Sequence, residues 1–204
     1  RDAFVSKRYQ TLQDLPENAI VGTSSTRRSC QIRALRPDCD IQPLRGNVNT
    51  RLAKLDAGQY DAIILASAGL KRLGFNQRIT SYLDTEISLP AIGQGAIGIE
   101  CRQGDSNTEA LLEPLHDQRT ARAVTAERKI STALAANCHL PIAAHATESD
   151  AEINLRALVG SLDGKQIIRA CHSGAIQQME QISQQVAADL ISQGALELMA
   201  AVPD

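Results

Sequence analysis

The stretch AIVGTSSTRRSCQIRAL, residues 19–35, contains the clearest indication of the fold. A short apolar run ends in a Gly-Thr-Ser-Ser turn, and a helical pattern begins near Ser25 and continues to Leu35. A strand that leads directly into a helix is the basic unit of an α/β fold. Arg27 and Arg28 lie in the first turn of this helix, where the backbone amides already carry partial positive charge. A bound anion is the simplest offset for two further cations at this position.

The same strand–turn–helix pattern occurs twice more. CDIQPL leads into RGNVNTRLAKLDAG, residues 39–58, and YDAIILASAGL leads into KRLGF, residues 60–75. Three such units predict a mostly parallel sheet. Ligands of these sheets bind beyond the carboxyl ends of the strands, beside helix N-termini. We therefore expect Arg45 and Arg51, which flank the second junction, to lie at the same edge as the first arginine pair.

The second half of the chain has a different pattern. Residues 86–102, EISLPAIGQGAIGIECR, contain a glycine-rich, hinge-like loop, and AIGIEC within them predicts another buried strand. Helical patterns cover roughly residues 107–115 and 118–134. Residues 152–174 predict a β-hairpin with Asp-Gly at its tip, and residues 177–200 predict a helix broken at Gly194. The sequence therefore predicts an α/β unit followed by a small α+β unit.

Composition excludes several classes of protein. The chain has 204 residues, of which 43% are hydrophobic and 22% charged, as in ordinary globular proteins. No apolar run approaches the roughly 20 residues of a membrane span. The basic region lacks interleaved aromatic side chains, so nucleic-acid binding by stacking is not expected. Cysteines at irregular spacing, without a signal-peptide pattern, indicate free thiols in a reducing cytoplasm and no metal site.

Positive charge is concentrated between residues 20 and 80, and it comes mainly from arginine. The planar guanidinium suits bidentate binding of carboxylate or phosphate. The alternative is that these arginines are solvated and paired with Asp38, Asp40 and Asp56. Free amides and hydroxyls in Gly-Thr-Ser-Ser and Gly-Asn, at the same helix ends, favour the anion site.

The cysteines differ in their surroundings. Cys138, in AANCHLPIA, falls on an expected loop, where a cysteine is either an inert packing residue or a nucleophile or attachment point. Cys30, Cys39, Cys101 and Cys171 fall within or at the ends of expected elements, and we expect all four to be packing residues.

Five motifs together resemble one family: VGTSSTRR, LRGNVNTRL, DAIILASAGLKRLG, LPAIGQGAIGIECR and NCHLPI. In this order they resemble porphobilinogen deaminase, also called hydroxymethylbilane synthase. The resemblance implies a transferase that condenses four porphobilinogen molecules, with loss of ammonia, into hydroxymethylbilane. It also implies a dipyrromethane cofactor attached through a thioether to Cys138. Residues matching the family's cofactor contacts are Thr23, Ser25, Arg27, Arg28, Arg45, Asn47, Arg51 and Gln94, and those matching substrate contacts are Arg28, Arg45, Arg51 and Arg72.

The resemblance covers only the latter two-thirds of the family's chain. It implies a carboxylate-binding domain of periplasmic-binding-protein-like type in residues 1–95, a segment returning to the first domain in residues 96–115, and a cofactor-attachment domain in residues 116–204. The family's catalytic aspartate belongs to a Lys-Asp motif of the first domain, which does not occur in this sequence. We therefore expect the chain to be inactive without a first domain, which a separate chain would have to supply, and AIGIEC to expose an apolar edge. The full-length enzyme is expected to be a cytoplasmic monomer.

Some positions depart from the family pattern. The family usually has Leu at the position of Thr26. It also has Gly-Gly at the positions of Ala136 and Asn137, and Gly at the position of Ala143. Because these last three positions lie near the cofactor cysteine, the geometry there is expected to differ. An alternative function is a non-catalytic module for small anions, resembling a lobe of a solute-binding or effector-sensing protein. Such a lobe would need neither a modified thiol nor the C-terminal α+β unit.

Overall fold

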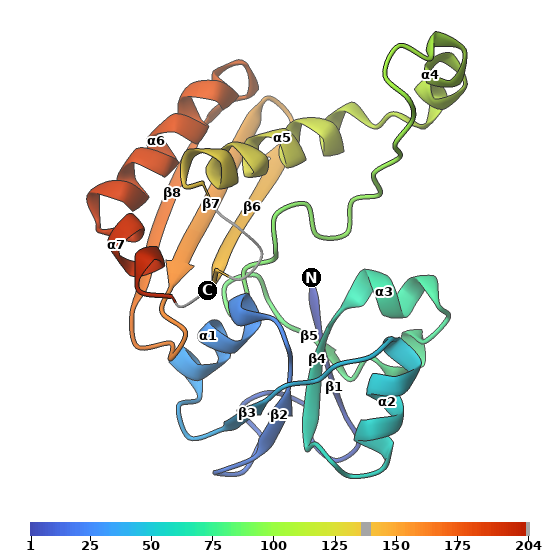
Figure 1. Cartoon of the computed structure of the whole chain (residues 1–204), viewed down its shortest axis with the longest axis vertical. Coiled ribbons are helices and arrows are strands. Elements are labelled where there is room, and N and C mark those ends of the chain that lie inside the picture. The colour runs from blue at the N-terminus through green and yellow to red at the C-terminus, as the bar shows by residue number, and fades with distance from the viewer. Residues whose placement is uncertain (136–139, 203–204) are drawn as a thin grey trace.

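The structure, a computed structural model, describes residues 1–135 and 140–202. It consists of two units that lie against each other, joined by a long extended segment (Figure 1). The mixed α/β unit comes first and a small unit with an antiparallel sheet follows, as the sequence predicted. Among the residues described, no helix is both long and apolar enough to span a membrane.

A five-stranded sheet forms the centre of the first unit. Its strands are β1 (Asp2–Ser6), β2 (Ile20–Gly22), β3 (Asp40–Gln42), β4 (Ala62–Ala66) and β5 (Ser81–Tyr82). They lie in the order β3-β2-β4-β1-β5. The predicted parallel arrangement is confirmed for β2, which pairs in parallel with both β3 and β4. β1 runs antiparallel between β4 and β5 and was not predicted, because a run this short shows no clear period.

Helices follow each of the three parallel strands, as predicted. They are α1 (Thr26–Leu35), α2 (Val48–Asp56) and α3 (Ser67–Arg72), with a 3₁₀ turn η1 (Asn76–Arg78) after α3. Successive strand residues point to opposite faces of the sheet. Phe4 and Ile64 therefore pack on one face with Ile32 of α1, whereas Val5 and Ile63 pack on the other face with α2 and α3. Both faces are covered, and the carboxyl ends of the parallel strands lead into the helices.

The second unit packs helices on one face of an antiparallel sheet with the order β6-β7-β8 (Figure 1). Its elements are α5 (Gln118–Ala133), β6 (Ile142–Ser149), β7 (Glu152–Gly160), β8 (Ile167–Ala175), η3 (Ile176–Gln178), α6 (Met179–Ser192) and α7 (Ala195–Ala200). The predicted hairpin is confirmed, with Asp163 and Gly164 in the turn between β7 and β8. The predicted break at Gly194 is also confirmed, since this residue has φ +93° between α6 and α7.

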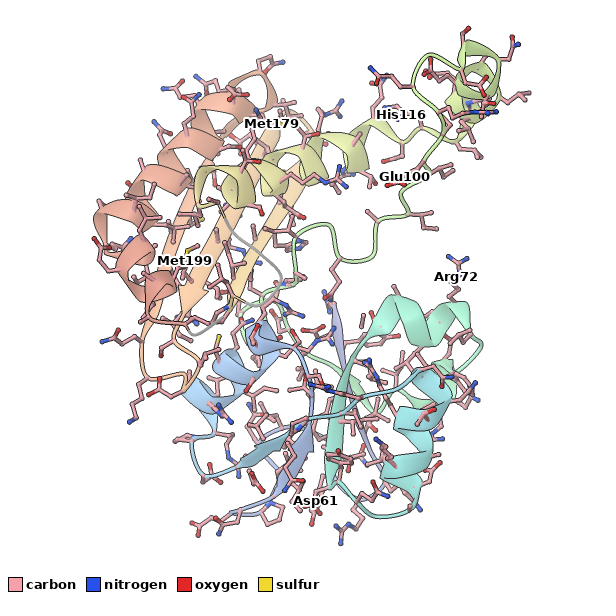
Figure 2. All side chains as sticks on the ribbon, in the orientation of Figure 1. Asp61, Arg72, Glu100, His116, Met179 and Met199 are labelled. Carbon is pink, nitrogen blue, oxygen red and sulfur yellow. The ribbon has the colours of Figure 1, made fainter. Side chains whose placement is uncertain are left out.

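The joining segment is not a strand, so that part of the prediction is wrong. Residues 97–102 have no regular structure, and Ile97 and Ile99 are 79% and 54% exposed. They form no strand because no other strand of the described chain lies beside them. The expected exposure of apolar side chains is observed. Glu100 and His116 stand clear of both sheets (Figure 2), and the segment continues into α4 (Ser106–Leu112) and η2 (Glu113–Leu115).

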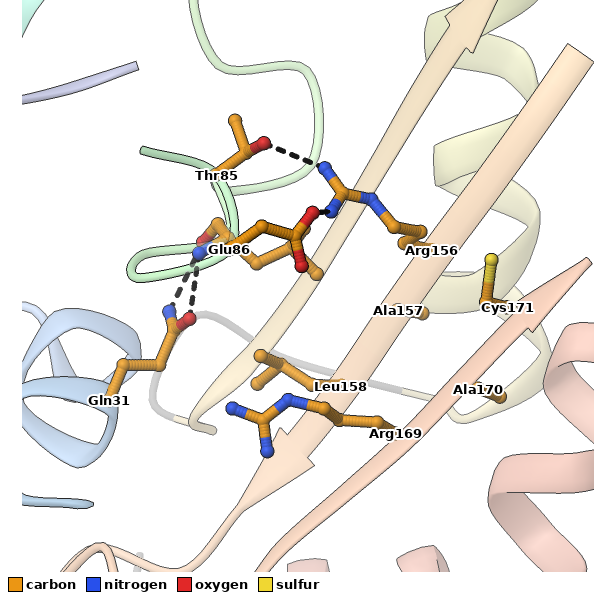
Figure 3. Close-up of a pocket in the computed structure, with 10 residues that line it drawn as sticks. Gln31, Thr85, Glu86, Arg156, Ala157, Leu158, Arg169, Ala170 and Cys171 are labelled. Atoms are coloured by element: carbon orange, nitrogen blue, oxygen red, sulfur yellow. Dashed lines mark hydrogen bonds and ion pairs between the residues drawn. The ribbon is translucent and has the colours of Figure 1, made fainter. Parts of the chain in front are cut away.

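The two units touch through the outer face of β7 and through the hairpin turn. Leu89 of the first unit packs with Leu158 of β7. Arg156 of β7 forms an ion pair with Glu86 and donates a hydrogen bond to Thr85 Oγ1 (Figure 3). In the hairpin turn, the carbonyl oxygen of Leu162 accepts a hydrogen bond from Arg33 Nη1 of α1 at 2.9 Å. The second unit is thereby attached both to α1 and to the segment that follows β5.

Candidate functional site

The turn between β2 and α1 is built by its own hydroxyl groups. Ser25 is the N-cap of α1, and its Oγ accepts a hydrogen bond from the backbone N–H of Arg28 at 3.4 Å. Thr23 Oγ1 accepts one from the backbone N–H of Ser25 at 3.2 Å. Serine is favoured at this position because it satisfies an amide that has no partner within the helix. The positive end of α1 is thereby fixed at the edge of the sheet.

A hollow of about 290 Å³ lies beside this helix terminus. Arg45, which follows β3, reaches the same hollow, so the structure brings it together with Thr23 and Ser25. Guanidinium and hydroxyl groups beside a helix N-terminus suit a carboxylate. Among the described lining residues there is no acidic side chain: they are Thr23, Ser24, Ser25, Thr26, Ser29, Arg33, Ile41, Pro43, Arg45 and Leu162.

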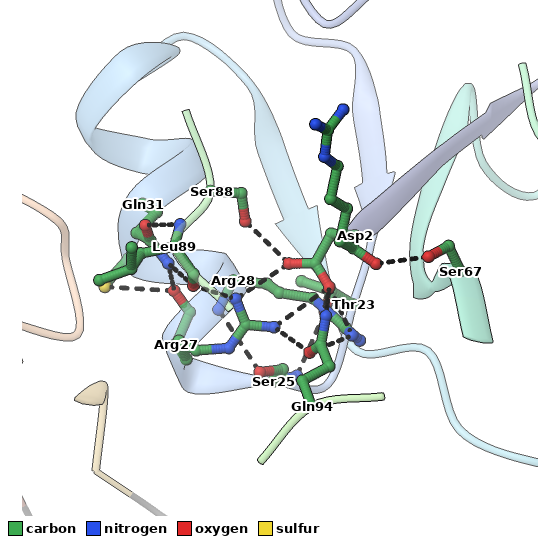
Figure 4. Close-up of polar contacts among 12 residues, drawn as sticks. Asp2, Thr23, Ser25, Arg27, Arg28, Gln31, Ser67, Ser88, Leu89 and Gln94 are labelled. Carbon is green, nitrogen blue, oxygen red and sulfur yellow. Dashed lines mark hydrogen bonds and ion pairs between the residues drawn. The ribbon is translucent and has the colours of Figure 1, made fainter. Parts of the chain in front are cut away.

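A buried carboxylate, Asp2, organises the first arginine pair (Figure 4). Its Oδ2 accepts hydrogen bonds from Arg27 Nη1 at 2.9 Å and Ser88 Oγ at 2.8 Å. Its Oδ1 accepts from Arg28 Nε at 2.9 Å and Gln94 Nε2 at 3.0 Å. Burial by itself would raise the pKa of Asp2, but the two guanidinium groups outweigh it and lower the pKa from 3.8 to about 2. Asp2 is therefore ionised at neutral pH.

Asp2 was missed by the sequence analysis, and the suggested alternative pairing of the arginines was wrong. Asp38 pairs with Arg36, Asp56 pairs with Arg78, and Asp40 accepts a hydrogen bond from Gln42. Within the described chain none of the three forms an ion pair with the first arginine pair. The partners of Asp2 lie far away along the chain. The only local feature that could have indicated its role is a carboxylate at the start of the apolar run DAFV.

Arg27 is occupied by internal contacts. Besides Asp2, it donates from Nη1 to the carbonyl oxygen of Leu89 at 2.6 Å and from Nη2 to Gln94 Oε1 at 3.1 Å. Its Nε is buried and has no partner among the residues that the structure describes. Arg27 and Gln94 thus join α1 to the segment after β5, and their contact with a cofactor stays a prediction.

Arg28 and Arg51 are less completely engaged. Arg28 donates from Nε to Asp2 and from Nη2 to Gln94 Oε1, and Nη2 also forms an ion pair with Asp2, while its Nη1 makes no hydrogen bond within the described chain. Arg51 donates from Nε to the carbonyl oxygen of Gly46 at 2.7 Å. Asn47 is the N-cap of α2, accepting at Oδ1 from the backbone N–H of Thr50 at 2.9 Å.

Arg72 is not brought to this site by any contact that the structure gives. It is exposed at the end of α3 and points away from that helix, toward the side where Glu100 lies (Figure 2). Its role in binding substrate therefore stays a prediction.

Two family models match the chain. Porphobilinogen deaminase, dipyromethane cofactor binding domain, matches residues 1–110, and Porphobilinogen deaminase, C-terminal domain, matches residues 121–192. The chain belongs to the porphobilinogen deaminase family. Membership implies a transferase of porphyrin biosynthesis with a hydroxymethylbilane synthase-like function.

The donor groups at the hollow fit the cofactor of a porphobilinogen deaminase. The matched cofactor-binding domain contains the α1 turn, the Asp2 cluster and Arg45, Arg51 and Arg72. A dipyrromethane carries several carboxylates, and the hollow offers arginine and hydroxyl groups without a competing acidic side chain among the residues described. No part of the described chain brings together three side chains of the kinds that hold a metal ion.

The cysteines of the chain are only partly as predicted. Cys30 and Cys39 are buried packing residues, as expected, but Cys101 and Cys171 are exposed, so that expectation was wrong for both. Cys101 lies on the extended joining segment, and Cys171 lies on the face of β8 that the helices do not cover. Cys138, with Ala136 and Asn137, lies outside the described residues.

Ala143 is fully buried, and it packs between the two units with Leu89 and Leu158. Its small side chain therefore contributes to the contact between the units.

Proposed function

We propose that this chain holds a dipyrromethane by its carboxylates beside α1 and acts as part of a hydroxymethylbilane synthase. The observation that carries the proposal is the lining of the hollow, which combines guanidinium and hydroxyl groups with a helix N-terminus. Family membership supports the same chemistry. When bound, dipyrromethane supplies the pyrrole carbon to which the first porphobilinogen is joined.

The polar residues near the hollow would have separate roles in binding. Arg45 and Arg51 hold carboxylates of the cofactor and of the growing polypyrrole, with Thr23, Ser25 and Asn47 shaping the turns beside them. Arg28 would offer its Nη1, which has no partner in the described chain, while Asp2 fixes the other side of its guanidinium group. This arrangement orients acidic substrates before reaction, which is how a positioned cation assists catalysis.

The first unit would then act as an anion-binding lobe of the periplasmic-binding-protein type. In such lobes the ligand lies beyond the carboxyl ends of parallel strands. The turns after β2 and β3, which carry Ser25 and Arg45, occupy that position.

We further propose that residues 96–115 pack against a first domain, on this or another chain, that supplies the catalytic aspartate. Ile97, Ile99, Leu111 and Leu115 are exposed along this segment, and an apolar run of this kind favours a covering partner. The chain would be inactive without that domain, and the complete enzyme would be a cytoplasmic monomer.

The cofactor is proposed to be attached through a thioether to Cys138. In the full-length gene product, the intact mass should exceed the sequence mass by one dipyrromethane. Cys138→Ser should abolish this excess, whereas Cys171→Ser, which changes another cysteine of the same unit, should keep it. Equal loss in both variants would show that the wrong cysteine was chosen, and no excess in the unsubstituted protein would favour a plain anion-binding module.

The role of Arg45 predicts a loss of affinity for polypyrroles. Charge-assisted hydrogen bonds contribute about 1.5–3 kcal/mol, so Arg45→Ala should weaken retention of intermediates about tenfold or more. Retention can be measured in the full-length enzyme as the fraction of protein that carries intermediate masses after porphobilinogen is added. Arg119→Ala, which removes an exposed arginine from α5, is the matched control. Equal retention in both variants would argue against a carboxylate contact at Arg45.

A further inference from the structure

A buried carboxylate of the second unit, Glu127 of α5, takes part in none of the contacts described above. Glu127 is 5% exposed. Its one contact at ion-pair distance within the described chain is with His145 of β6, whose Nδ1 lies 3.5 Å from Oε1. Acidic side chains are rarely buried to this degree unless they are paired. The hydrogen bonds that hold Glu127 therefore indicate what it does.

The two oxygen atoms of Glu127 bind two different parts of the chain. Oε1 accepts a hydrogen bond from the backbone N–H of Ala146, in β6, at 2.9 Å. Oε2 accepts one from the backbone N–H of Gly93, in the segment that follows β5, at 2.6 Å. Ala146 belongs to the second unit, as Glu127 does, whereas Gly93 lies in the segment that leaves the first unit. Glu127 thus fixes this segment to α5 and β6.

The next residue, Gln94, connects the same segment to the first arginine pair (Figure 4). Its Nε2 donates to Asp2 Oδ1 at 3.0 Å, and its Oε1 accepts from Arg27 and Arg28 at 3.1 and 3.5 Å. A shift of Gly93 would move Gln94 as well, because the two residues are adjacent. A continuous series of contacts therefore leads from Glu127 to the guanidinium group of Arg28.

We propose that Glu127 is a positioning residue for substrate binding. By fixing Gly93 it places Gln94, and Gln94 in turn orients Arg28. This inference rests on the proposed function, in which Arg28 offers its Nη1 to a carboxylate of the substrate or of the growing polypyrrole.

The position of Glu127 in the sequence gives this role its purpose. α5 and β6, the two elements that it joins, precede and follow the segment containing Cys138, the proposed attachment residue. In the proposed function the cofactor is attached to the second unit while arginines of the first unit hold carboxylates. Such a site needs the two units in a fixed relation, since small displacements of reacting groups are costly. Glu127 supplies one of the contacts that fix it.

The contact between Glu127 and Gly93 is tested by amide hydrogen exchange on the chain itself. Glu127→Ala should speed exchange of the Gly93 N–H about tenfold or more, because it removes a charge-assisted hydrogen bond. Glu148→Ala is the matched control. It removes another buried carboxylate of the second unit, one that binds Arg122 instead, and should leave exchange at Gly93 unchanged. The proposal is overturned if Glu127→Ala does not speed this exchange, or if both variants speed it equally.

The effect on substrate is measured in the full-length enzyme with Glu127→Gln. Glutamine keeps the size of the side chain but offers one acceptor oxygen to two N–H groups. Arg28 would hold a carboxylate before and during reaction alike, so its poorer placement should raise KM for porphobilinogen about threefold or more and change kcat little. A merely structural role would give a different result: partial unfolding would lower kcat and leave KM unchanged, because the remaining folded enzyme is normal. That second pattern would overturn the proposal.

Two further variants test the route and separate this inference from the proposed function. If Glu127 acts through Gln94, the double variant Glu127→Gln, Gln94→Ala should have the same KM as Gln94→Ala alone, whereas independent effects would multiply. An unchanged KM in Arg28→Ala would remove Arg28 from the proposed function, and the positioning role with it. A raised KM in Arg28→Ala, together with an unchanged KM in Glu127→Gln or with multiplying effects, would overturn the role of Glu127 alone.

Discussion

Asp2→Ala is expected to lower the free energy of unfolding by about 3–5 kcal/mol, the usual effect of removing one partner of a buried ion pair. Arg27 would remain buried, at 4% exposure, without its counter-ion. Arg28, Ser88 and Gln94 would also lose the oxygen atoms to which they donate. Urea unfolding of the two proteins measures the difference.

Asp56→Ala is the matched control for this substitution. Asp56 pairs with Arg78 near the surface, where solvent screens the interaction. Its loss should therefore change the free energy of unfolding far less. If the two substitutions have equal effects, Asp2 does not hold the arginine pair in the way described.

The lowered pKa of Asp2 predicts how this stabilisation depends on pH. The folded state resists protonation of Asp2 more than the unfolded state does, since the pKa falls from 3.8 to about 2 on folding. Ionised Asp2 therefore contributes on the order of 2 kcal/mol to the free energy of unfolding. This contribution is complete above about pH 4 and is lost as the pH falls to about 2. Asp2→Asn removes the titrating group but keeps the shape. The difference in unfolding free energy between the two proteins should therefore shrink across that interval. A constant difference would mean that Asp2 does not titrate in this range.

Gly164→Ala is expected to lower the free energy of unfolding by about 2–4 kcal/mol, from backbone strain and overpacking together. Gly164 has φ +73°, which L-residues rarely adopt. A Cβ atom here would also lie 2.6 Å from the carbonyl oxygen of Cys30 and 2.8 Å from Arg33 Cβ. Both residues belong to α1, which is fixed in the core through Ile32 and cannot move aside locally.

Gly74→Ala separates the two causes. Gly74 has nearly the same φ, +74°, but a Cβ there would meet no atom within 4 Å. Only the backbone strain should remain, with an effect of about 1–2 kcal/mol. The difference between the two substitutions measures how closely the β7–β8 turn docks on α1. Equal effects would show that this turn is not docked in solution.

The elements that the sequence predicted are those whose causes are local. Ser25 and Asn47 cap helices within three residues of themselves, and Asp-Gly turns a hairpin between adjacent strands. The strand predicted in AIGIEC does not form, because a strand depends on a neighbour that is distant in the sequence. An apolar run becomes a strand only beside another strand, and residues 97–102 have no such neighbour in the described chain.

The candidate site shows the same division. The hydroxyl-rich turn and Arg45 could be placed together because parallel strands end at one edge of a sheet. Asp2 could not be assigned, since its partners Arg27 and Gln94 lie far from it along the chain. The exposure of Cys101 and Cys171 could not be predicted from the sequence either, because it depends on which parts of the sheet and of the joining segment are covered by other segments.

The sequence by itself determined the β/α units, the helix caps, the C-terminal hairpin and the resemblance to porphobilinogen deaminase. These follow from residue periodicity, turn chemistry and motif order. Only the tertiary structure decided how the arginines differ: Arg27 is neutralised by Asp2, whereas Arg45 faces a hollow lined by hydroxyl groups. The physical reason is that electrostatic pairing depends on distance in space, and folding alone brings β1, α1 and the segment after β5 within a few ångströms of one another.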